Sequence, residues 1–78
     1  MMEQPVVQIK YAAREILGDI PSPIFMGRIE RTLDEGVANM DSLCQACTKV
    51  EKMVHLFIGV ETSKVVGQRF REILENVI

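Results

Sequence analysis

The stretch Ser42–Ile58, SLCQACTKVEKMVHLFI, decides the fold that the sequence predicts. Its apolar residues recur every three or four positions, the spacing that keeps one stripe of an α-helix against a partner. Ser42 followed by Gln45 is typical of a capping box, Asn39 is a rival cap one turn earlier, and Gly59 can close the helix in a left-handed conformation. We predict a central helix over 42–58, around which the rest of the chain is built. Its buried stripe is Leu43, Ala46, Cys47, Val50, Met53, Val54 and Phe57.

The same periodicity predicts three further helices, near residues 5–17, 23–35 and 62–77. Neither a sustained alternation of apolar and polar residues nor a hairpin-turn dipeptide predicts a strand. We therefore expect one all-α domain over residues 1–78, a compact four-helix bundle-like fold. The predicted caps are Ser22 before Pro23 and, for the last helix, Thr62 or Ser63. The predicted core positions of these helices are Val6, Ile9, Ala13, Ile16, Leu17, Phe25, Ile29, Leu33, Val66, Phe70, Ile73 and Val77.

The two halves of the chain share a pattern. A shift of 41 residues places Ile9 on Val50 and Gly18 on Gly59. We interpret the halves as two pseudo-repeated helical hairpins of one plan, although any two amphipathic hairpins would match in part.

Composition and charge indicate a globular protein and do not favour nucleic-acid binding. The chain is 47% hydrophobic and 26% charged, with a formal net charge of −2. Residues 1–41 carry four basic and seven acidic side chains, and residues 42–78 carry five and four, so we expect no basic face. With no predicted targeting segment and no apolar run of about 18 residues, we expect a soluble, cytoplasmic protein.

Cys44-Gln45-Ala46-Cys47 is the motif that most invites a chemical function. A CxxC pair at a helix start can be a redox couple, but such couples normally follow a strand. Cys47 falls on the apolar stripe, where cysteine behaves as a small hydrophobe, and Cys44 lies at its edge. His55, the one histidine, is expected to be half-buried and paired with Glu51. We expect two free thiols, no metal or cofactor and no catalytic set, and hence no enzyme.

Asp41-Ser42-Leu43 resembles the attachment motif of acyl carrier proteins, which are small acidic four-helix proteins. The resemblance implies Ser42 as a phosphopantetheine attachment site. The chain departs from that family in the helix before the motif, where carriers have a long loop. It departs again at Lys49 and Lys52, where carriers present acids.

A helix-turn-helix DNA-binding regulator is a second alternative. Counting from Gly36 as the turn glycine, the spacing requires apolar residues at the positions of Ser42 and Gln45. Counting from Gly59 gives Val65 but then Gln68. Because phosphate contacts also need clustered lysine or arginine, we expect nucleic acid to be an unfavoured partner.

The remaining expectation is a small non-enzymatic protein-interaction or regulatory module that self-associates, in the usual form of a symmetric homodimer. The back of the central helix is the candidate partner surface, because Leu56 is an apolar residue on an otherwise polar side. This surface comprises Gln45, Lys49, Lys52 and Leu56. The sequence names neither the partner nor the process.

Overall fold

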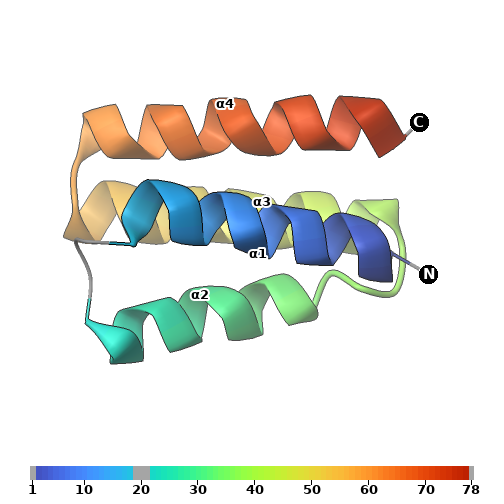
Figure 1. The fold of residues 1–78 in the computed structure, drawn as a ribbon, viewed down its shortest axis with the longest axis horizontal. Helices are drawn as coiled ribbons and strands as arrows, with labels where there is room; N and C mark the ends of the chain where they lie inside the picture. Colours follow the sequence, from blue (N-terminus) through green and yellow to red (C-terminus); the bar gives the residue numbers. More distant parts are fainter. Residues whose placement is uncertain (1, 19–21, 78) are drawn as a thin grey trace.

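The computed structural model describes residues 2–18 and 22–77, which form four α-helices. They are α1 (Glu3–Leu17), α2 (Pro23–Asp34), α3 (Met40–Phe57) and α4 (Val60–Val77). Consecutive helices run in opposite directions along one axis (Figure 1), as in an up-down bundle. The helices form a ring, because α1 and α3 each pack against both α2 and α4. The predicted all-α, four-helix fold is confirmed.

α3 is not the centre of this arrangement. It occupies one corner of the ring, diagonally opposite α1, which lies in front of it in Figure 1. α1 contributes as fully to the core as α3, including Ala12, which the predicted stripe omitted. An apolar stripe shows that a helix has one buried face. Every helix of a four-helix bundle has such a face, so the stripe does not identify a central helix. The largest fully buried side chains are Ile9, Leu17, Ile29, Leu33, Leu43, Val50, Val54, Val66 and Phe70.

The start of α3 differs from the predicted cap. Asn39 has an extended backbone, and its side-chain oxygen accepts a hydrogen bond from the backbone N–H of Ser42 at 2.8 Å. Ser42 therefore lies inside the first turn, and the helix begins two residues earlier than predicted. The rival cap is the one used.

The α3–α4 connection is also tighter than predicted. Gly59 has φ +141°, the region that the sequence assigned to it, and α4 begins directly after it at Val60. The backbone N–H of Ser63 donates to the Gly59 carbonyl at 3.2 Å, so Thr62 and Ser63 lie within the helix and do not cap it. The predicted cap of α2 is confirmed, because the Ser22 side chain accepts from the Phe25 N–H.

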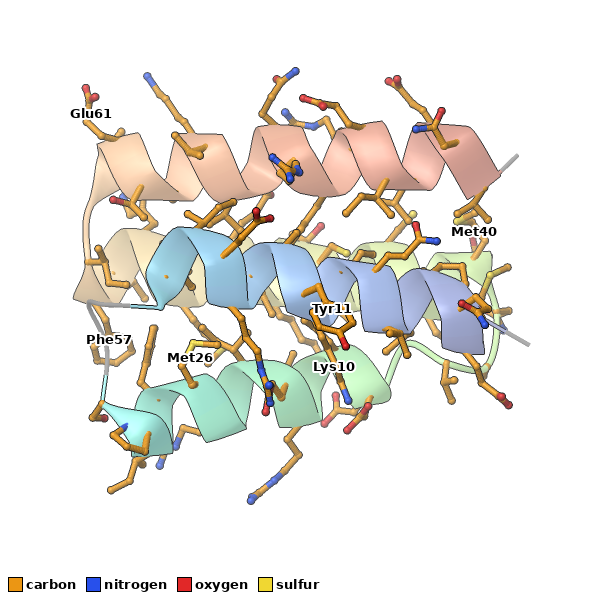
Figure 2. The ribbon with its side chains drawn as sticks, viewed as in Figure 1. Lys10, Tyr11, Met26, Met40, Phe57 and Glu61 are labelled. Carbon is orange, nitrogen blue, oxygen red and sulfur yellow. The ribbon has the colours of Figure 1, made fainter. Side chains whose placement is uncertain are left out.

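Phe57 is the main error in the predicted core. It is the last residue of α3 and is 71% exposed. It lies at the end of the bundle, between α3 and the first turn of α2 (Figure 2), where its ring meets Phe25 edge-on. Periodicity assigns a residue to a face of the helix, but it does not say how fully the neighbouring helix covers that residue.

Candidate functional site

An apolar groove lies between α2 and α3, with a volume of about 650 Å³. Its floor contains the half-buried side chains of Phe25, Met53 and Ile58. Ile24 on α2 and Phe57 on α3 also line the groove and are 76% and 71% exposed. Two large apolar side chains therefore remain in water at the edges of an apolar depression.

The pairing of α2 with α3 places Phe57 at the edge of this groove. The first turn of α2 lies beside the last turn of α3, where the Phe25 ring packs edge-on against Phe57 with the centroids 5.6 Å apart. One face of the Phe57 side chain is thereby fixed while the rest stays exposed. A side chain held in place but uncovered is suited to contact a partner.

Charged groups border the groove on the α2 side. Arg28, Arg31 and Glu35 line it together with the apolar residues. Neither arginine is in an ion pair with any residue of the described ranges 2–18 and 22–77. Both arginine side chains are exposed, so an acidic ligand in the groove can reach them.

The predicted partner surface on α3 is exposed along its whole length. Gln45, Lys49, Lys52 and Leu56 all face solvent, and Leu56 is 76% exposed. Lys49 lies 3.6 Å from a carboxylate oxygen of Glu35, with both side chains mostly exposed. Leu56 does not line the apolar groove. The exposed apolar side chain of Phe57 beside that groove was missed by the sequence reasoning, which placed it in the core.

A second groove, of about 610 Å³, lies between α3 and α4 and is polar. The Glu51 carboxylate lies in it, 3.8 Å from Arg71. It lies so close to α4 that a Cβ on Gly67 would be within 1.9 Å of Oε1, so glycine permits this position. His55 lines the same groove and is exposed. The predicted half-buried His55–Glu51 pair is thus wrong, because Glu51 turns across the groove to α4.

The cysteines lie as the sequence predicts. Cys47 is buried and Cys44 is exposed, and both are free thiols. Burial raises the pKa of the Cys47 thiol to about 12, which opposes the thiolate that redox exchange needs. Within residues 2–18 and 22–77, no three His, Cys, Asp or Glu side chains come together in a way that could hold a metal ion.

The residues of the two alternative functions occupy ordinary structural positions. Ser42 is half-buried in the first turn of α3, a short connection after α2. α2 and α3 are antiparallel neighbours (Figure 1), whereas the helices of a DNA-binding helix-turn-helix cross at roughly 90–120°. In the described part of the chain, no helix is both long enough and apolar enough to cross a bilayer.

Comparison of the chain with protein-family models, curated proteins and solved structures gives no match. The function is therefore argued from the grooves and their charges.

Proposed function

We propose that the protein is a non-enzymatic protein-interaction module that binds an α-helix of a partner protein in the groove between α2 and α3. The observation that carries the proposal is the exposure of Ile24 and Phe57 along a groove with an apolar floor. Burying a large apolar side chain contributes roughly 1.5–3 kcal/mol, so a partner that covers both gains substantial free energy.

The partner segment should be helical because of the groove's walls. Both walls are helices, whose backbone N–H and C=O groups are already paired within α2 and α3. They offer no strand edge to which an extended peptide could add. A ligand must then pair its backbone N–H and C=O groups within itself. An amphipathic helix does so while presenting apolar side chains at three- and four-residue spacing.

The test is selection from a displayed library of amphipathic helical peptides, followed by mapping of the bound peptide by amide chemical-shift changes. Phe57→Ala should weaken binding by about tenfold or more, because a central aromatic anchor typically carries over 1.4 kcal/mol of an interface. Tyr11→Ala is the matched control, since Tyr11 is an aromatic residue of α1 that is 68% exposed. It should leave binding unchanged.

Three results would contradict the proposal. The first is that no peptide is selected, and the second is that shift changes fall outside the α2/α3 groove. The third is equal weakening by Phe57→Ala and Tyr11→Ala. Sedimentation equilibrium tests whether the protein self-associates through this groove. If the protein is a homodimer and Phe57→Ala dissociates it, a second copy of this chain occupies the groove.

A further inference from the structure

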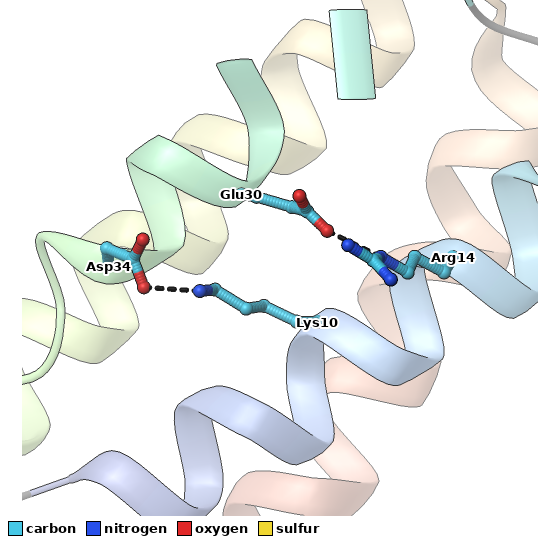
Figure 3. Close-up of polar contacts among 4 residues, drawn as sticks. All are labelled: Lys10, Arg14, Glu30 and Asp34. Carbon is cyan, nitrogen blue, oxygen red and sulfur yellow. Dashed lines mark hydrogen bonds and ion pairs between the residues drawn. The ribbon is translucent and has the colours of Figure 1, made fainter. Parts of the chain in front are cut away.

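The basic side chains of this protein are divided between two sides of the bundle. Those around α1 are neutralised by carboxylates on the neighbouring helices. Lys10 lies 2.5 Å from Asp34 and Arg14 lies 2.5 Å from Glu30 (Figure 3), which joins α1 to α2. Arg69 of α4 lies 3.1 Å from Glu15 of α1. These three cations leave little charge for a ligand to recognise.

The other six of the nine basic residues flank α3. Arg28 and Arg31 line the α2/α3 groove, and Lys52, Lys64 and Arg71 line the α3/α4 groove. Lys49 lines a small depression with Glu35 near the start of α3. We call these six residues the α3 basic face: Arg28, Arg31, Lys49, Lys52, Lys64 and Arg71.

The carboxylates that share these grooves are too few to balance the α3 basic face. Glu35 and Glu51 are the only acidic residues among the described ones that line them. Among the residues that line these three depressions, six cations and two carboxylates leave an excess of four positive charges, in a chain whose net charge is −2. The members of this set are spread from residue 28 to residue 71, so only the fold brings them around α3.

We infer that the helix bound in the α2/α3 groove is acidic, with an apolar stripe bordered by Asp or Glu on its edges. This inference rests on the proposed function and names the chemistry of its partner. The apolar stripe would contact Ile24 and Phe57, and carboxylates on one edge would meet Arg28 and Arg31. Guanidinium groups suit this role because they bind carboxylates through two parallel hydrogen bonds. Lys52 and the α4 cations would attract the opposite edge across α3.

The exposed apolar side chains that line the same groove as the arginines favour a protein over nucleic acid. Ile24 and Phe57 gain little from a phosphate backbone, and the chain as a whole repels a polyanion through its net charge of −2. The charge also disfavours a symmetric dimer through this face, because two-fold symmetry would bring two positive faces together. A different, acidic chain satisfies both the apolar and the charged groups.

The test uses two synthetic 18-residue amphipathic helices with the same leucine stripe, one bordered by Glu and the other by Lys. The acidic peptide should bind about tenfold more tightly at low salt, as expected from a few exposed ion pairs. The difference should shrink as sodium chloride shortens the screening length from about 10 Å at 0.1 M to 3 Å at 1 M. Isothermal titration calorimetry at several salt concentrations measures both effects.

Paired substitutions locate the charge that matters. Arg28→Gln with Arg31→Gln should weaken the acidic peptide severalfold and leave the basic peptide unchanged or improved. Lys10→Gln with Arg69→Gln removes the same two charges on the side of α1 and should change the affinity less than twofold. Equal losses in the two double variants would mean that net charge, and not the α3 basic face, attracts the peptide.

The outcomes separate this inference from the proposed function. Equal binding of the two peptides, or preference for the Lys peptide, overturns the acidic partner and leaves the groove as a helix-binding site. Binding of neither peptide overturns both. Binding of a 20-base-pair DNA duplex that the double arginine variant abolishes and Phe57→Ala leaves intact would overturn the inference in favour of nucleic acid.

Discussion

Two phenylalanines of this chain provide the sharpest test of the exposed groove. Phe57 is 71% exposed at the end of α3, whereas Phe70 of α4 is 1% exposed in the core. The sequence pattern placed both in buried stripes. Replacing each by alanine removes the same atoms from two very different surroundings.

The structure sets the expected costs. Phe57→Ala loses chiefly the edge-on contact with Phe25, and such aromatic pairs contribute about 0.5–1.5 kcal/mol. Phe70→Ala removes a fully buried ring and leaves a cavity, for which the cost is about 3–5 kcal/mol. A domain of 78 residues has a total free energy of unfolding of roughly 4–12 kcal/mol, so the second change removes a large part of it.

Urea unfolding followed by far-UV circular dichroism measures both variants, because the signal is almost entirely helical. We expect the midpoint of Phe57→Ala to stay near that of the unmodified protein and the midpoint of Phe70→Ala to fall steeply. A Phe70→Ala variant that is unfolded without urea agrees with this expectation. A cost of about 3 kcal/mol or more for Phe57→Ala would refute the reasoning, since Phe57 would then be a core residue and not an available contact.

Three further predictions concern caps, thiols and a helix interior; the same unfolding assay measures their stability effects, and the mass gain on each thiol follows its labelling. Asn39→Ala should cost about 1 kcal/mol because it removes the α3 cap, whereas Ser42→Ala should cost less than about 0.5 kcal/mol; the reverse order would restore the capping box. Burial raises the pKa of the Cys47 thiol from 9.0 to about 12 in the folded protein. Between these two pH values the unfolded chain loses a proton that the folded protein keeps, so the free energy of unfolding should fall as pH rises, by up to about 1.4 kcal/mol per pH unit. Cys47→Ala should lose that dependence, and Cys44 should react first with iodoacetamide in the folded protein. Gly27→Ala should raise the free energy of unfolding by about 0.5–1 kcal/mol, because the helical Cβ would meet nothing within 4 Å, and a decrease would contradict the open space there.

The sequence by itself determined the four helices and most of the core. The three- and four-residue spacing identified Ile9, Leu43 and Val50 as buried, because a helix can turn only one stripe towards its neighbours. Local chemistry set some of the helix ends, since Ser22 caps α2 and Gly59 closes α3 with effects that reach no further than one turn. That the two halves of the chain are pseudo-repeated helical hairpins of one plan stays a prediction.

The tertiary structure decided which faces remain open and how charge is distributed over them. Phe57 stays exposed because the one ring packed against it, that of Phe25, covers only part of its side chain, and that contact joins two helices. The positive charge around α3 comes from residues on three helices, so no window of the sequence contains it. Each helix pattern is set by contacts between near neighbours in the chain, whereas a binding surface is set by which helices pack side by side and where each one ends.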